Sequence, residues 1–128
     1  MDSAKPPKNL VIEQETTGYR YSIEPFLLAD FMPLLPGQSV LDIGTGCGII
    51  PLLLVNREPN IKVTAIEIQD KISQQAQKNI HKNEMDAQIS LIHGDFLKEA
   101  ANLKPESFDH IVSNPPYRKI QTGRLNPD

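Results

Sequence analysis

The turn Asn114-Pro115-Pro116-Tyr117 combines residue types that can make a planar nitrogen reactive. The amine of an adenine or an amide is a poor nucleophile because its lone pair is delocalised into the attached π system. The Asn114 side-chain oxygen and the Pro115 carbonyl could accept hydrogen bonds from both amine protons and favour a tetrahedral nitrogen. Pro115 and Pro116 fix φ and remove competing N–H groups, and Tyr117 offers a face for stacking. The turn predicts chemistry on such a nitrogen, although it could also simply close a strand.

A glycine-rich turn precedes it in the chain, where Gly44, Gly46 and Gly48 follow an apolar segment that contains Asp42. A side chain at the middle position would hold a ligand away from the backbone, and the last glycine allows close packing. The spacing differs from the G-x-G-x-x-G of dinucleotide-binding folds, and Asp42 would repel a pyrophosphate. Asp42 could instead attract a cationic ligand, which favours S-adenosylmethionine with its sulfonium and ammonium groups. A tight turn without a ligand is the alternative.

Two further acidic residues follow predicted strands. Glu67 ends the second strand, where an acid accepts hydrogen bonds from ribose hydroxyls in nucleotide-binding folds, and Ile68 would cover one face of the adenine. Asp95 follows the third strand and could accept a hydrogen bond from the adenine amine, while Phe96 contacts the ring. Asp95 could equally cap the helix that begins near Phe96, and the two roles are compatible.

Alternating strands and helices must position these groups. The residue pattern predicts strands over residues 40–43, 61–68, 89–93 and 108–113, and a short strand over residues 10–12. It predicts helices from Ser22 to before Pro33, over residues 49–57, from Asp70 through Ile80, and over residues 96–101. This alternation favours an α/β fold with a parallel sheet and right-handed crossovers. Such sheets bind ligands at the carboxyl ends of their strands, where the candidate groups stand.

Length and composition restrict the class of protein. We expect the 128 residues to form one domain over residues 21–128, preceded by a flexible arm over residues 1–20. The chain is 39% hydrophobic and 23% charged, and no apolar run approaches the roughly 20 residues of a membrane-spanning helix. No secretory signal is apparent, and the single cysteine, Cys47, excludes an internal disulfide. We therefore predict a cytoplasmic protein without membrane contact, in which Cys47 is a small filler.

Charge and histidine placement bear on partners and metals. The net charge of −3 argues mildly against attraction of nucleic acid to the whole surface. A basic tail nevertheless adjoins the Asn-Pro-Pro-Tyr turn, with Arg118, Lys119 and Arg124, and could either contact a polyanion or be solvated. The three histidines are dispersed without the spacing of metal ligands, so we predict no metal site.

The two turns, in this order, resemble those of the class I, Rossmann-like methyltransferases with an N-P-P-Y loop. Within that group, the chain looks most similar to the bacterial valine-tRNA adenine-N6 methyltransferases. The segments that carry the resemblance are residues 19–24, 27–31, 41–51, 67–69, 113–117 and 123–127. The resemblance covers nearly all of the chain from about Gln14 onward.

The resemblance implies a binding site and a substrate. It implies contacts of S-adenosylmethionine, or its product S-adenosylhomocysteine, with Asp42, Gly44, Glu67 and Asp95. It implies a target adenine held by the Asn-Pro-Pro-Tyr turn, with Asn114 beside both the adenine and the cofactor. The substrate would be structured RNA, most simply tRNA. Two alternatives remain: a glutamine-N5 methyltransferase of release factors, which uses the same turn, and a non-catalytic S-adenosylmethionine-binding module.

The resemblance also implies an architecture. We expect a partial Rossmann-like class I methyltransferase fold, with four parallel strands in the order 3-2-1-4 and helices on both faces. The family's sheet continues beyond the fourth strand, so we expect the domain to be truncated after the Asn-Pro-Pro-Tyr turn. The outer edge of the fourth strand would then be open, and we expect self-association through it.

Overall fold

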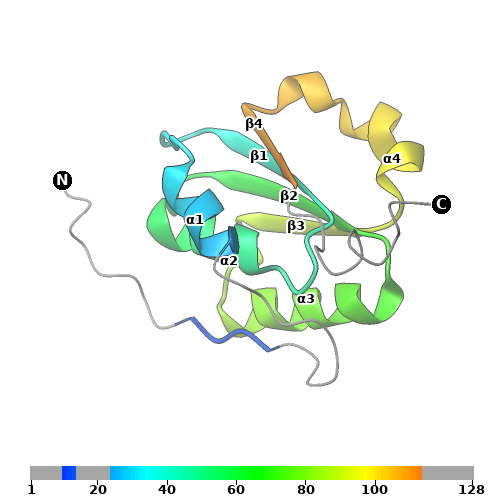
Figure 1. The fold of residues 1–128 in the computed structure, drawn as a ribbon, viewed down its shortest axis with the longest axis horizontal. Coiled ribbons are helices and arrows are strands. Elements are labelled where there is room, and N and C mark those ends of the chain that lie inside the picture. The colour runs from blue at the N-terminus through cyan, green and yellow to red at the C-terminus, as the bar shows by residue number, and fades with distance from the viewer. Residues whose placement is uncertain (1–9, 14–23, 114–128) are drawn as a thin grey trace, which may run out of the picture.

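The computed structural model describes residues 10–13 and 24–113, which form an α/β domain (Figure 1). Strands and helices alternate along the chain as the residue pattern predicts. In chain order the elements are α1 (Glu24–Phe31), β1 (Ser39–Ile43), α2 (Ile49–Arg57), β2 (Lys62–Glu67), α3 (Asp70–Lys82), β3 (Ile89–His93), α4 (Phe96–Leu103), the 3-10 helix η2 (Pro105–Ser107) and β4 (His110–Ser113). Within residues 24–113, no helix is long and apolar enough to cross a membrane.

The strands form one parallel sheet in the order β3-β2-β1-β4, which confirms the expected order. The crossovers through α2 and α3 step in one direction across the sheet, whereas the crossover through α4 steps back. Right-handed crossovers therefore place α2 and α3 on one face and α4 on the other. Figure 1 shows this arrangement, with α3 below the sheet and α4 above it. The expectation of helices on both faces is confirmed.

The apolar core lies around the two central strands and the helix that connects them. Val40 and Leu41 of β1 are fully buried, as are Leu52 and Leu54 of α2. A nearly continuous apolar run is typical of a parallel strand that is covered on both faces. Pro51 falls in the first turn of α2, where its missing N–H removes no helical hydrogen bond. Burial of this kind, and not helix propensity, holds α2 in place.

The register brings the carboxyl ends of all four strands to one edge of the sheet. Ile43 lies opposite both Ile66 and Ser113, and Glu67 lies opposite His93. The glycine turn, the acidic end of β2 and the β3–α4 turn therefore lie next to one another. This is the edge at which the sequence predicts the functional site.

Two predicted elements differ from the structure. The short strand predicted over residues 10–12 is wrong, because these residues adopt an extended course that hydrogen-bonds to side chains of α3 and of the residue after it. Apart from residues 10–13, the predicted arm over residues 1–20 lies outside the described residues. The strand predicted from residue 108 begins only at His110; at Asp109 the main-chain N–H donates to the Ser39 carbonyl, while the side chain, in place of a main-chain carbonyl, accepts the Ser39 N–H.

Candidate functional site

The glycine turn has a backbone that favours glycine at each of its three positions. Gly44, Gly46 and Gly48 have φ angles of 75°, 61° and 90°, in the left-handed region that side chains disfavour. A Cβ added at Gly44 or Gly46 would meet no atom of the described residues within 4 Å, so with respect to this part of the chain the backbone is open to a ligand. A Cβ at Gly48 would lie 3.6 Å from the Cβ of Ala76, which shows that this glycine faces α3.

Main-chain hydrogen bonds hold the turn against the end of β2. The N–H groups of Gly44 and Thr45 both donate to the Ile66 carbonyl, over 2.9 and 3.0 Å. The next N–H along the turn, that of Gly46, donates to a side chain instead. These bonds set the shape of the turn before any ligand arrives.

Glu67 joins the glycine turn to the start of α3. Its Oε1 accepts the N–H of Gly46 over 2.8 Å, and its Oε2 accepts the N–H of Gln69 over 3.1 Å. Glu67 is only 5% exposed. Each carboxylate oxygen can accept two hydrogen bonds, so both retain capacity for ligand hydroxyls. The structure therefore places Glu67 beside the turn, and each of its oxygens can accept one more hydrogen bond.

Asp42 lies beneath the turn and is almost fully buried, at 1% exposure. Its Oδ2 accepts the Thr45 hydroxyl over 2.7 Å, whereas its Oδ1 has no hydrogen-bond partner among the described residues. Burial raises the pKa of Asp42 to about 7, the charge of Glu67 acts in the same direction, and the Thr45 hydrogen bond opposes both. A buried acceptor without a partner is costly, so a ligand that brings a donor or a cation here would be stabilised.

The remaining predicted cofactor residues follow β2 and β3. Ile68 is 59% exposed and can cover a flat ring. Asp95 accepts the N–H of Leu97 over 3.0 Å through Oδ1, so the capping role left open by the sequence is confirmed. Phe96, the first residue of α4, is half-buried. The N–H of Gly94 donates to the Glu67 carbonyl over 2.9 Å and holds these two strand ends together.

The predicted catalytic turn, residues 114–117, lies outside the described residues. The strand that leads to it, β4, ends at Ser113, opposite Ile43 at the start of the glycine turn. Within residues 10–13 and 24–113, no group of three His, Cys, Asp or Glu side chains could hold a metal ion. Burial raises the pKa of the Cys47 thiol, which agrees with a filler role.

Sequence reasoning missed two polar residues of this region. Thr45 binds Asp42, and Asn79 of α3 donates to the Cys47 carbonyl inside the glycine turn over 2.8 Å. The signal for Asn79 was present, since it stands between Ala76 and Ile80 on the apolar side of an amphipathic helix. A polar residue on such a stripe is buried and therefore needs partners.

Comparison with known proteins identifies the family. The family model described as "Methyltransferase small domain" matches residues 25–126. A tRNA1(Val) (adenine(37)-N6)-methyltransferase from Shewanella sediminis (strain HAW-EB3) is 33% identical over 122 residues, which cover 93% of this chain and 50% of the relative. One from Proteus mirabilis (strain HI4320) is 32% identical over 86% of this chain and 44% of its own length. The chain thus spans about half the length of these relatives.

Solved structures agree with this assignment. A precorrin-6y C5,15-methyltransferase from Geobacter metallireducens GS-15 has the same fold, with a TM-score of 0.68 over 89% of this chain and 56% of its own, at 17% identity. An S-adenosylmethionine-dependent methyltransferase from Thiobacillus denitrificans, solved with S-adenosyl-L-homocysteine, is 27% identical with a TM-score of 0.51, over 57% of this chain and 29% of its own. The chain belongs to the methyltransferase small domain family.

Proposed function

We propose that this chain binds S-adenosylmethionine across the carboxyl ends of β1, β2 and β3, as the cofactor-binding half of an adenine-N6 methyltransferase of tRNA. The observation that carries the proposal is the pair of buried carboxylates beside an open glycine turn. Asp42 presents an oxygen without a partner among the described residues, and Glu67 keeps acceptor capacity on both of its oxygens. The residues present therefore fit a ligand that is cationic at one end and carries hydroxyls at the other.

Each end of the cofactor has a matching group. Glu67 would accept the ribose hydroxyls, as acids at this strand end do in nucleotide-binding folds. Ile68 would cover one face of the adenine, and Asp95 would accept its amine while still capping α4. Asp42 would face the cationic amino-acid end, either directly or through water. The same carboxylates would repel a pyrophosphate, so a dinucleotide is disfavoured.

The second half of the proposal concerns methyl transfer. When bound, S-adenosylmethionine supplies an electrophilic methyl group on a sulfonium sulfur. The Asn114 side-chain oxygen and the Pro115 carbonyl would hold the two protons of the target amine, and Tyr117 would stack on its ring. These residues would align the nitrogen and stabilise the positive charge that develops on it, without a strong base. In the chain they follow β4, and β4 pairs with β1, the strand that leads to the glycine turn.

The substrate is inferred from the relatives. The Shewanella sediminis and Proteus mirabilis proteins are named as methyltransferases of adenine 37 in tRNA1(Val), and most of this chain aligns with them. The basic residues Arg118, Lys119 and Arg124 follow the Asn-Pro-Pro-Tyr turn in the sequence and could contact phosphates. We therefore propose tRNA as the substrate of the whole protein.

Calorimetric titration with S-adenosylhomocysteine tests the cofactor site. The wild-type chain should bind it, and Glu67→Ala should bind roughly 10- to 100-fold more weakly, because charge-assisted hydrogen bonds contribute about 1.5–3 kcal/mol. Glu106→Ala, in the exposed η2 at the far end of β4, is the matched control and should bind as wild type. Unchanged affinity in Glu67→Ala would exclude Glu67 from the site.

A transfer assay with radiolabelled cofactor tests the substrate. The full-length protein should label unmodified tRNA1(Val) and lose the label when adenine 37 is replaced. Labelling of a glutamine in a release factor would instead support glutamine-N5 transfer. Binding of the cofactor without any transfer by the full-length protein would indicate a binding module.

A further inference from the structure

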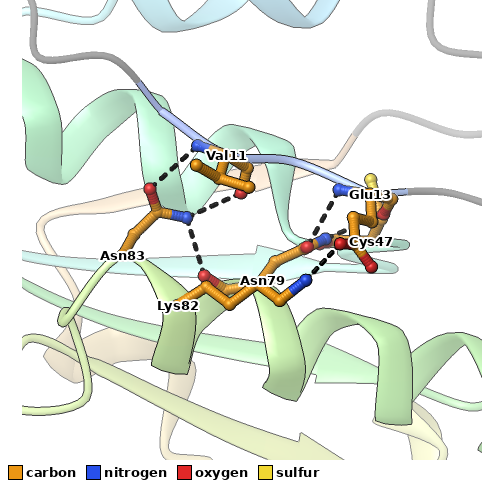
Figure 2. Close-up of polar contacts among 6 residues, drawn as sticks. All are labelled: Val11, Glu13, Cys47, Asn79, Lys82 and Asn83. Atoms are coloured by element: carbon orange, nitrogen blue, oxygen red, sulfur yellow. Dashed lines mark hydrogen bonds and ion pairs between the residues drawn. The ribbon is translucent and has the colours of Figure 1, made fainter.

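Residues 10–13 lie along α3, where two asparagine side chains bind their main chain (Figure 2). Asn83 accepts the N–H of Val11 over 3.0 Å and donates to the Val11 carbonyl over 2.8 Å. Asn79 accepts the N–H of Glu13 and donates to the Glu13 carbonyl, both over 2.9 Å. Each side-chain amide thus pairs with both main-chain groups of one residue, as a neighbouring strand would.

Helix and strand geometry explain why this pairing fits. Residues four apart on a helix are about 6 Å apart along its axis, and residues two apart in an extended chain are separated by about 6.6 Å. The pairs Asn79–Glu13 and Asn83–Val11 use this match, with the segment antiparallel to the helix. The alternate residues, Leu10 and Ile12, pack against the apolar core. The segment is therefore fixed by both its amides and its side chains.

The two asparagines differ in their third hydrogen bond. Asn83 donates from Nδ2 to the carbonyl of Asn79, one turn earlier in the chain, over 2.7 Å. Asn79 donates from Nδ2 to the carbonyl of Cys47, over 2.8 Å, between Gly46 and Gly48 of the turn. Asn79 is 0% exposed. It therefore joins the N-terminal segment to the glycine turn. Asn83, by contrast, binds the segment and has no hydrogen bond to the turn among the described residues.

We propose that Asn79 is a positioning residue for cofactor binding, which fixes the Cys47 carbonyl and the glycine turn while residues 10–13 are docked on α3. This inference rests on the proposed role of the turn in binding the cofactor. If the segment left α3, Asn79 would lose its bonds to both main-chain groups of Glu13 and would have to rotate or remain unsatisfied. Docking of the segment and binding of the cofactor are therefore coupled. By linkage, each strengthens the other by the same factor.

Three variants of the whole chain separate the contributions. Asn79→Asp keeps the shape but places an oxygen against the carbonyls of Cys47 and Glu13, so it loses both of these bonds and keeps only the bond from the Glu13 N–H. Asn83→Asp loses the bonds to the carbonyls of Val11 and Asn79 but can still accept the Val11 N–H. It leaves the Asn79 bond to the Cys47 carbonyl in place. Lys82→Ala removes a surface ion pair with Glu13 and leaves the amide bonds in place, so it is the control. In titrations with S-adenosylhomocysteine, the affinity of Asn79→Asp should fall by about tenfold or more relative to wild type. The affinity of Asn83→Asp should fall less, and that of Lys82→Ala should not change.

Amide hydrogen exchange gives a readout that a loss of packing alone would not move. S-adenosylhomocysteine should slow exchange at the amides of Val11 and Glu13 in wild type and in Lys82→Ala, but not in Asn79→Asp. If Asn79→Asp fails to fold, Glu13→Pro removes the N–H that Asn79 accepts, together with the ion pair for which Lys82→Ala is the control, and should reproduce the loss of affinity. Wild-type affinity in a folded Asn79→Asp, or unchanged exchange at Glu13 in liganded wild type, would overturn the proposal.

Measurements without ligand distinguish this inference from the proposed function. Asn83→Asp should speed exchange at the amide of Gly46 in the free protein, because the loosened segment no longer supports the turn through Asn79. Unchanged exchange there would overturn the coupling whether or not the wild type binds the cofactor. A wild type that does not bind S-adenosylhomocysteine would count against the proposed function instead.

Discussion

Replacing Asp42 by asparagine should stabilise the folded chain and weaken its cofactor binding. Burial raises the pKa of Asp42 from 3.8 to about 7, so the folded chain retains a proton that the unfolded chain has already lost. Stability should therefore fall as the pH rises from about 4 to about 7 and then stay constant. The difference between these two pKa values, at about 1.4 kcal/mol per pH unit, amounts to about 4 kcal/mol. The amide side chain of the variant carries no charge at any of these pH values and avoids this loss.

Denaturant unfolding at several pH values measures this effect. The free energy of unfolding of Asp42→Asn should equal that of wild type near pH 4 and exceed it increasingly up to about pH 7. Asp30→Asn, at an exposed position of α1, should follow the wild-type curve. A stability difference between Asp42→Asn and wild type that does not change between pH 5 and pH 8 would refute the reasoning.

Binding gives the complementary test. A cationic group beside Asp42 favours the ionised carboxyl, so S-adenosylhomocysteine should release a proton from wild type near pH 6 to 7. Calorimetry in buffers of different ionisation enthalpy would detect it. Asp42→Asn should release none and should bind more weakly. Equal proton release in the variant would assign the proton to another group.

Three further predictions concern the turns and the sheet edge. Gly46→Ala should cost about 1–2 kcal/mol of stability and also weaken cofactor binding. Gly37→Ala, which has a similar positive φ far from the site, should cost stability alone. Equal cofactor affinities of the two variants, measured by titration and corrected for the unfolded fraction, would contradict this. In the full-length protein, Asn114→Ala should abolish transfer to tRNA in a radiolabel assay while cofactor affinity stays near wild type, and near-normal turnover would exclude its role. The 128-residue chain should self-associate through β4, which pairs only with β1 among the described strands and exposes 51% of Ile111. A clean monomer by sedimentation velocity at micromolar concentration would contradict the last.

The residue pattern was sufficient to predict the strands and helices of a parallel sheet because its signals are local, whereas the strand order was implied by the family resemblance. An apolar strand that runs into glycines, and acids that follow β-branched strands, depend on neighbours in the chain. Asp42 and Glu67 lie beside the glycine turn because β1 and β2 are parallel neighbours, and the carboxyl ends of parallel strands lie at one edge of the sheet. The structure adds two features that sequence spacing does not show. The Gly46 N–H donates a hydrogen bond to the Glu67 side chain, and one oxygen of Asp42 has no partner among the described residues.

The N-terminal segment shows where local reasoning fails. The sequence predicts a short strand over residues 10–12, and the segment is indeed extended, but its hydrogen-bonding partners are Asn79 and Asn83, far along the chain. Helix periodicity explains which side of α3 is buried. It does not show that two asparagine side chains replace a strand there, since this depends on long-range contacts.

Because Asn79 and Asn83 hold this segment through main-chain amides, they can recognise it largely without regard to the side chains at Val11 and Glu13. Substitutions at these two positions should be tolerated as long as the N–H remains, so proline is the residue to be excluded. Leu10 and Ile12, which pack on the core, should instead remain apolar. The segment is thus expected to accept replacement by an unrelated extended sequence with the same apolar alternation, and sequence divergence there is compatible with an unchanged architecture.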